Sequence, residues 1–160
     1  MTTLSFLEIQ LRDATVRKRR DAARELGRSK RPAAIPLLGA ALSDAHSGVR
    51  AEIAIALGSL DDSAAVPFLL GALNDTEPDV RAAAIAALGK IGDPAAVDAL
   101  ITCLSDTATA VRIGACEVLG KLKCKRAVSA LESLLDDPFL EVREAAGSAQ
   151  NRIRTKTTMR

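Results

Sequence analysis

The hydrophobic and polar positions of the chain repeat with a period of 31 residues. Segment 47–60, SGVRAEIAIALGSL, recurs as PDVRAAAIAALGKI at 78–91 and as TAVRIGACEVLGKL at 109–122. A shorter apolar stretch precedes each of these segments and recurs at the same interval, with leucine columns such as Leu38, Leu69, Leu100 and Leu131. The same shift toward the N-terminus reaches Leu7, which indicates a diverged first repeat and five repeats in all.

Within one repeat, the apolar spacing is that of two α-helices. In the longer segment the apolar residues return every three or four positions, at Val49, Ile53, Leu57 and Leu60. This predicts a helix from about Ser47 to Leu60, and the shorter stretch predicts one from about Pro32 to Leu42. We name the first helix of each repeat helix A and the second helix B. One such pair is too small to bury its own apolar face, so the pairs must stack on one another.

The predicted fold class is therefore all-α, a right-handed α-solenoid of five helix pairs. The repeats are expected to form one domain over residues 1–154, divided at about 1–29, 30–60, 61–91, 92–122 and 123–154. Residues 155–160 are expected to be a disordered basic tail. Asp93-Pro94 and Asp137-Pro138 each predict an N-cap followed by proline in the first helical position.

A polar column accompanies the apolar ones. Each repeat has an aspartate where helix A ends: Asp13, Asp44, Asp75, Asp106 and Asp137. Six residues later comes an arginine near the start of helix B: Arg19, Arg50, Arg81, Arg112 and Arg143. Two interpretations are open, a structural ladder in which each aspartate binds a helix B N-terminus and a neighbouring arginine, or an arginine row for phosphate or carboxylate. We favour the ladder, because a charge kept in every repeat suits stacking better than a local site.

The recurring order of these residues resembles a known family. An aspartate is followed by a Val-Arg pair and then by Ala-x-x-Ala-Leu-Gly, as in residues 75–89, and the resemblance extends from Thr3 to Ile153. This pattern is similar to the short HEAT-like repeats named after phycobilisome lyases. That family includes bilin lyase subunits, phycobilisome-degradation proteins, deoxyhypusine hydroxylase and many binding scaffolds, so the resemblance is specific for the fold and unspecific for the function.

The resemblance also implies where a partner would bind. In HEAT-like solenoids the B helices line the concave surface, and helical spacing turns one set of B-helix residues away from the core. The candidate binding residues are Arg20, Arg24, Ala51, Glu52, Ile55, Ala82, Ala86, Lys90, Ile113 and Glu117. This set is apolar in its middle and charged at its ends, which is typical of protein interfaces. The alternative is that alanine is present only because it favours helices.

The leading functional hypothesis is a protein-binding scaffold or adaptor that uses this surface. An alternative, from the resemblance, is a bilin lyase or another component that handles phycobiliprotein chromophores, with a phycobiliprotein as partner. Nucleic-acid binding is a further alternative, because segment 12–31 is strongly basic. It is disfavoured, because that segment lacks aromatic residues for base stacking and segment 44–106 is acidic. The basic repeat fits a solvated cap, or a partner protein with an acidic patch.

Catalytic and metal-binding constellations are not evident. By the resemblance, deoxyhypusine hydroxylase carries His-Glu pairs after Val-Arg for two irons, and the matching positions here hold no histidine, only Glu52 as an acidic match. His46 is the single histidine, in a turn, and is expected to be solvated. Cys103 and Cys116 fall in small core columns, whereas Cys124 is expected to be exposed. We therefore assign no catalytic residue, metal or cofactor. The residues favour a binding role over an enzymatic one and leave an enzymatic role open.

Three cysteines without CxxC spacing argue against a disulfide framework. The first residues lack the basic start of a signal peptide. No uncharged apolar run is long enough to span a bilayer. A cytoplasmic protein without membrane insertion is the expectation.

Overall fold

The computed structural model describes residues 3–155, which contain α-helices and short 3-10 helices and no strand. They form two compact units, Met1–Ile91 and Gly92–Arg160. The first unit contains α1 (Leu4–Gln10), α2 (Val16–Arg28), α3 (Ala34–Ala41), α4 (Ser47–Leu60), η1 (Ser63–Ala65), α5 (Val66–Ala72) and α6 (Pro78–Ile91). The second contains η2 (Pro94–Ala96), α7 (Val97–Thr102), η3 (Cys103–Ser105), α8 (Thr109–Lys121), η4 (Lys125–Ala127), α9 (Val128–Ser133), η5 (Leu134–Asp136) and α10 (Leu140–Arg154).

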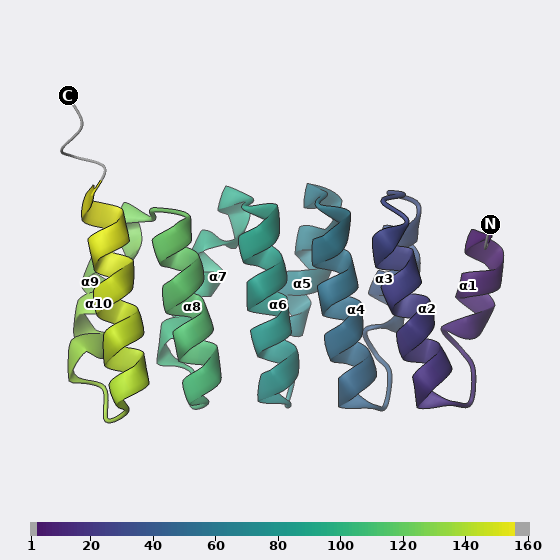
Figure 1. Cartoon of the computed structure of the whole chain (residues 1–160), viewed down its shortest axis with the longest axis horizontal. Coiled ribbons are helices and arrows are strands. Elements are labelled where there is room, and N and C mark those ends of the chain that lie inside the picture. The colour runs from purple at the N-terminus through teal and green to yellow at the C-terminus, as the bar shows by residue number, and fades with distance from the viewer. Residues whose placement is uncertain (1–2, 156–160) are drawn as a thin grey trace. The chain divides into compact units, whose positions relative to one another are not determined.

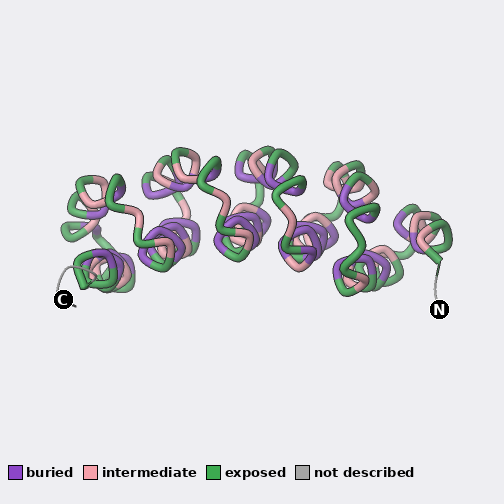
Figure 2. Tube along the Cα trace, turned by 90° about the horizontal axis from the view of Figure 1, so that it is seen from above, coloured by how far each residue is buried: buried purple, intermediate pink, exposed green. Residues whose placement is uncertain are grey.

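The predicted helix pairs are present. The even-numbered α-helices are the B helices, and they run side by side within each unit (Figure 1). Seen from above, the A and B helices of each unit form two rows, and their buried residues face the space between these rows (Figure 2). The predicted core residues of α4, Val49, Ile53 and Leu57, are fully buried, so the prediction of its core face is confirmed.

Close packing between consecutive B helices depends on a glycine column. A Cβ atom added to Gly27 would lie 2.8 Å from the Cα of Ala56, and one added to Gly58 would lie 2.7 Å from the Cα of Ala87. The same relation holds in the second unit, where a Cβ on Gly120 would lie 2.8 Å from the Cα of Ala149. These separations are too short for real Cβ atoms, so larger residues would force the helices apart.

The A helices are shorter and less regular than predicted. The predicted helix from Pro32 to Leu42 is α3, Ala34–Ala41. Asp93 caps the 3-10 turn η2, whose first residue is Pro94, and its side chain accepts from the Ala95 N–H at 2.9 Å. The prediction for Asp137-Pro138 was wrong, because α10 begins at Leu140 with Phe139 as its N-cap. Asp137 lies in the preceding turn, where its carboxylate binds Arg112 and the Phe139 N–H instead.

Candidate functional site

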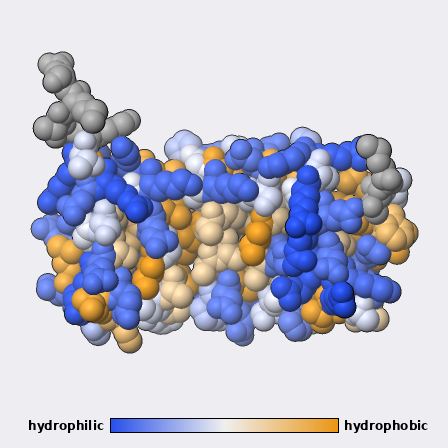
Figure 3. Space-filling view, in the orientation of Figure 1, coloured by the Kyte–Doolittle hydropathy of each residue, from blue (hydrophilic) through white to orange (hydrophobic). Residues whose placement is uncertain are grey.

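We define the B-helix face as the side of the B helices turned away from the A helices, which is the side seen in Figures 1 and 3. In the first unit its most exposed large apolar residue is Ile55 on α4, with 51% of its surface accessible. On α6, Ala86 and Lys90 are exposed, and Ala82 is half-buried, as is Ala51 on α4. Figure 3 shows apolar surface over α4 and α6 and a hydrophilic column over α2.

The hydrophilic column over α2 contains an ionic network of four residues, Arg20, Asp21, Arg24 and Glu52. Arg24 donates from Nη2 to Oε2 of Glu52 at 2.7 Å and from Nε to Oε1 at 3.3 Å. Arg20 donates from Nη2 to Oε2 of the same residue at 3.4 Å. Arg24 also binds Asp21 at 3.1 Å. Three of the predicted binding residues, Arg20, Arg24 and Glu52, are therefore joined across the packed pair α2 and α4.

The prediction that Glu52 is exposed on the binding face was wrong. This residue is 9% exposed and therefore buried. Its position follows Asp21 by one repeat length, on the side of α4 that packs against α2. The carboxylate is turned toward Arg20 and Arg24 because a buried charge needs an opposite charge and hydrogen bonds. Consequently it neutralises part of the basic column rather than offering an acidic group to a partner.

The two remaining predicted binding residues lie in the second unit, which has its own surface. Ile113, half-buried, and Glu117, exposed, belong to α8. They line one side of a shallow depression of about 270 Å³. Its other side is formed by residues of α10: Glu141, Glu144, Ala145, Ser148, Ala149 and Arg152. Its lining combines apolar residues with three glutamates and one arginine, so its charge is mainly acidic, whereas the column over α2 is mainly basic.

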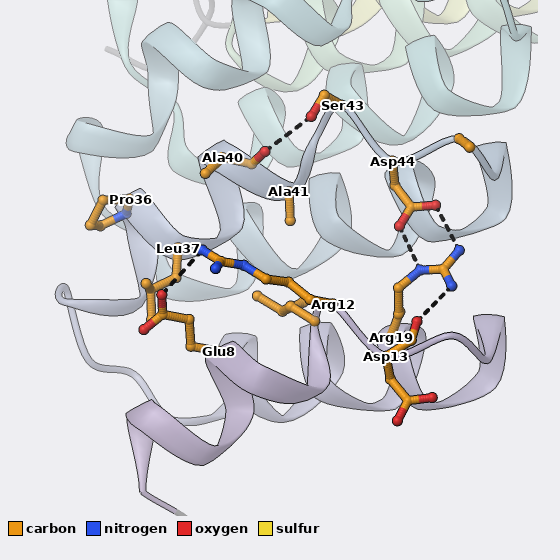
Figure 4. Close-up of a pocket in the computed structure, with 12 residues that line it drawn as sticks. Glu8, Arg12, Asp13, Arg19, Pro36, Leu37, Ala40, Ala41, Ser43 and Asp44 are labelled. Carbon is orange, nitrogen blue, oxygen red and sulfur yellow. Dashed lines mark hydrogen bonds and ion pairs between the residues drawn. The ribbon is translucent and has the colours of Figure 1, made fainter.

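The Asp and Arg columns meet from one repeat to the next. Arg19 binds Asp44 with Nε–Oδ2 at 2.6 Å and Nη2–Oδ1 at 3.0 Å, as Figure 4 shows. Arg50 binds Asp75 in the same way, at 2.7 and 2.8 Å. In the second unit Arg112 binds Asp137 at 2.9 and 3.1 Å, with both residues buried. Each pair is the two-pronged geometry in which guanidinium binds carboxylate most strongly.

Backbone groups complete each joint. Oδ1 of Asp75 also accepts from the Glu77 N–H at 2.9 Å, and Nη1 of Arg81 donates to the Asp75 carbonyl at 2.8 Å. The carboxylates of Asp13, Asp44, Asp106 and Asp137 accept from the backbone two residues later in the same way. Nη1 of every arginine of the column binds the carbonyl of the aspartate six residues before it.

These bonds lower the pKa of the aspartates. For Asp75, the hydrogen bonds from Arg50 hold the carboxyl pKa below its ordinary value, although partial burial opposes the shift. For Asp137, the hydrogen bonds from Arg112, helped by the Phe139 N–H, have the same effect. The carboxylates thus stay ionised and engaged at neutral pH, which is the state that the structural interpretation of the columns requires.

A hollow between A helices was missed by sequence reasoning. It has a volume of about 640 Å³ and lies between α1 and α3, with the Glu8–Arg12 ion pair and the side chains of Leu37 and Asp44 around it (Figure 4). A neighbouring hollow of about 420 Å³ lies between α3 and α5, where the ring of Phe68 covers Gly39. Both lie between neighbouring A helices. For the second hollow only, the occurrence of Gly39 and Phe68 in consecutive repeats was an available sequence signal.

The structure places the candidate reactive residues as follows. His46 is exposed and caps α4, with Nδ1 accepting from the Gly48 N–H at 3.1 Å. Cys103 and Cys116 are buried, as predicted, and burial raises the pKa of the Cys116 thiol to about 11. Cys124 is half-buried rather than exposed; it is the N-cap residue of η4, and its N–H donates to the Leu119 carbonyl at 3.0 Å.

Within residues 3–155 there is no group of three or more histidine, cysteine, aspartate or glutamate residues placed to hold a metal ion. None of the helices in this range is long and apolar enough to cross a membrane. The predicted disordered tail falls on residues 155–160, of which 156–160 lie outside the described residues.

Comparison with known families decides the classification. A profile of HEAT repeats matches residues 4–79 and 66–150, which together span most of the sequence. The chain belongs to the HEAT-repeat family. A search of curated proteins finds no significant match. The predicted fold class, an all-α solenoid of HEAT-like helix pairs, is confirmed by this match and by the similar structures described next.

Three solved structures illustrate this HEAT-repeat fold. A chain of the complex of CpcE and CpcF of phycocyanin lyase from Nostoc sp. PCC7120 is 27% identical, with a TM-score of 0.81 over 97% of this chain and 66% of that one. The chain thus spans just under two thirds of that relative's length. A designed armadillo repeat protein in complex with the peptide (KR)4 is 21% identical, with a TM-score of 0.69 over 94% of this chain and 81% of that one. Human deoxyhypusine hydroxylase is 18% identical, with a TM-score of 0.62 over 95% and 96% of the two chains.

Proposed function

We propose that this HEAT-repeat protein is a protein-binding scaffold and that the B-helix face of its first unit is the binding surface. The observation that carries the proposal is the exposure of Ile55 in the middle of a helix, beside the open alanine surface of α6. Protein interfaces commonly combine an apolar centre with a charged rim. Here Ile55 and Ala86 provide the centre, and the arginines of α2 provide one side of the rim.

The charge of this rim favours a partner with acidic side chains. The side chains of Arg20 and Arg24 remain 46% and 39% exposed although both bind Glu52. The carboxylate of Glu52 is shared by both guanidinium groups, and that of Asp21 binds Arg24 as well. Arg28 is exposed on the same helix. An acidic residue of a partner would find available N–H donors at the edge of the apolar centre.

Replacing Ile55 with Lys should weaken partner binding at least about tenfold, because it places a charge in the centre of the interface. The partner would first be captured with the wild-type chain and identified, and its Kd would then be measured by calorimetry. Ile9→Lys is the matched control, because Ile9 is an exposed isoleucine of the first unit on an A helix. Equal affinities of Ile55→Lys and wild type would place the interface elsewhere.

A second candidate function is a subunit that handles phycobiliprotein chromophores. The supporting observation is the similarity to a chain of the CpcE–CpcF complex, at 27% identity and a TM-score of 0.81. On this proposal the partner of the B-helix face is a phycobiliprotein or another lyase subunit. Co-elution of the purified chain with apo-phycocyanin would support it, and separate elution at micromolar concentrations of both proteins would contradict it.

Nucleic acid is not the expected partner. Glu52 and Asp21 already neutralise part of the basic column on α2, and phosphate binding by the remainder should be weak and steeply dependent on salt. We predict no appreciable change in fluorescence anisotropy of labelled duplex or single-stranded DNA at physiological salt. A tight complex that is lost when Arg20, Arg24 and Arg28 are changed to Glu would overturn this prediction.

A further inference from the structure

The arginine column contains one member with an open binding fork. In Arg19, Arg50 and Arg112 the Nε and Nη2 groups grip the aspartate of the following repeat, while Nη1 is fixed on a backbone carbonyl. Arg143 has the same anchor, because its Nη1 donates to the Asp137 carbonyl at 2.7 Å and to the Pro138 carbonyl at 3.2 Å. Among residues 3–155, however, none supplies an acceptor to its Nε and Nη2.

The anchoring makes Arg143 a prepared site for a carboxylate. The side chain is half-buried, and two backbone bonds hold the guanidinium as in the occupied joints. A planar fork held in place loses little conformational entropy when a carboxylate binds to it. The chemistry that fits is an aspartate presented by a turn, since that is what the other arginines bind.

The aspartate column contains the matching half. Oδ1 of Asp13 accepts from the Thr15 N–H at 2.8 Å, which is the turn geometry of Asp44 and Asp75. Those residues receive an arginine of the preceding repeat. Within residues 3–155, the side chains that donate to Asp13 are instead Lys18, at 3.2 Å from Oδ2, and the Thr15 hydroxyl, at 2.7 Å from Oδ1. The Lys18 side chain is 60% exposed, and that of Asp13 is 26% exposed against 10% for Asp44. An incoming arginine could therefore displace this lysine.

We propose that Arg143 of one molecule binds Asp13 of a second copy, so that the chain associates head to tail through a joint of the same kind as those inside each unit. A second copy fits because the chain carries both halves of the joint, the open guanidinium fork and the turn-held carboxylate, which are opposite in charge and matched in geometry. Because the two surfaces differ, the contact is heterologous, and each molecule keeps one half free after pairing. This proposal does not depend on the function of the B-helix face.

Residues outside the aspartate and arginine columns also affect the strength of this joint. Phe6 in the first repeat is equivalent in sequence to Phe68 in the third. The ring of Phe68 covers Gly39 of the preceding repeat, and Phe6 is 48% exposed. It is thus available to pack on the second copy. Two other residues oppose close packing between copies. The glycine column, which lets B helices pack closely, has Asn151 as its equivalent in the last repeat, and the alanine column against which it packs has Glu25 in the first. The helices of two copies cannot approach as closely as those within a unit, so the association should be weaker than an internal joint.

Sedimentation velocity of the full chain over a range of concentrations tests the proposal. We expect the weight-average sedimentation coefficient to rise with concentration at low salt and the rise to shrink as NaCl is added. Arg143→Ala and Asp13→Asn should each weaken association about tenfold to a hundredfold, the effect of losing a charge-assisted hydrogen-bonded pair. Circular dichroism melting would verify that both variants remain folded.

Mixing the two variants gives a sharper result than either alone. Arg143→Ala retains an intact Asp13, and Asp13→Asn retains an intact Arg143, so an equimolar mixture should form dimers that neither variant forms alone. Arg154→Ala, which removes an exposed arginine of α10, should associate like wild type. The proposal is overturned if wild type stays monomeric at every concentration, if the mixture does not associate, or if Arg154→Ala has the same effect as Arg143→Ala.

Discussion

Replacing Ile53 with Ala is expected to lower the free energy of unfolding by about 2–5 kcal/mol. Ile53 has no accessible surface and lies on the face of α4 that is turned toward the A helices. Truncation removes three buried carbon atoms and leaves a cavity whose walls belong to helices that are already closely packed. Urea unfolding followed by circular dichroism at 222 nm, the helical wavelength, would measure the change from the shift in midpoint.

The control is a change two residues away on the same helix. Ile55→Lys should alter the free energy of unfolding by no more than about 0.5 kcal/mol, because Ile55 is 51% exposed and surface changes usually stay in this range. If Ile55→Lys instead unfolds the protein, or if Ile53→Ala is neutral, the two faces of α4 have been assigned incorrectly. The pair therefore tests the helix geometry separately from the partner experiment on Ile55.

The sequence predicted helix B well for a physical reason. Its buried residues recur at helical spacing in several repeats, so Val49, Ile53 and Leu57 define one face without reference to anything outside α4. The aspartate and arginine columns were found in the same way. A neighbouring arginine was expected as the partner of each aspartate, but which arginine it would be was not predicted. The bidentate bonds join residues that lie 25 positions apart, and only the stacking of repeats brings them together.

Glu52 shows where this reasoning fails. Helical spacing puts it on the outward side of α4, and as a glutamate it would be expected in water. Its burial depends on Arg20 and Arg24 of the neighbouring helix, whose side chains reach over it. A residue at the boundary between two faces is assigned by what the next helix presents, and the periodicity of a single helix does not contain that information.

The irregular A helices were beyond prediction for a related reason. Their buried leucines give the period, but their ends depend on local hydrogen bonding, as where Asp93 caps a 3-10 turn before α7. The hollow between α1 and α3 depends on the spacing of whole helices rather than on any one residue. Neither property has a signature in a column of similar residues.

Replacing Asp75 with Ala is expected to lower the free energy of unfolding at neutral pH by about 1.5–3 kcal/mol, the range found for hydrogen bonds to charged groups. The change removes two bonds from Arg50, at 2.7 and 2.8 Å, and one from the Glu77 N–H at 2.9 Å. It also leaves the guanidinium of Arg50, only 14% exposed, without its carboxylate. A double-mutant cycle with Arg50→Ala would separate the energy of the pair from the effect of truncation. Unchanged stability with loss of partner binding would favour the alternative interpretation, in which the columns form a binding site.

The same pair predicts how this difference depends on pH. Since the pKa of Asp75 is lower in the folded protein than its ordinary value of 3.8, the carboxylate contributes its full stabilisation above about pH 4. That contribution is lost as the pH falls through the lowered pKa, because the folded state must then bind a proton it disfavours. The stability of the wild-type chain should therefore decrease below about pH 4, and its advantage over Asp75→Ala should shrink with it. Asp13, whose pKa is lowered to about 2, extends this window downward. Urea unfolding of both proteins at neutral and at acidic pH would measure the gap, and a gap that stays constant would show that the charge of Asp75 is not what stabilises the joint.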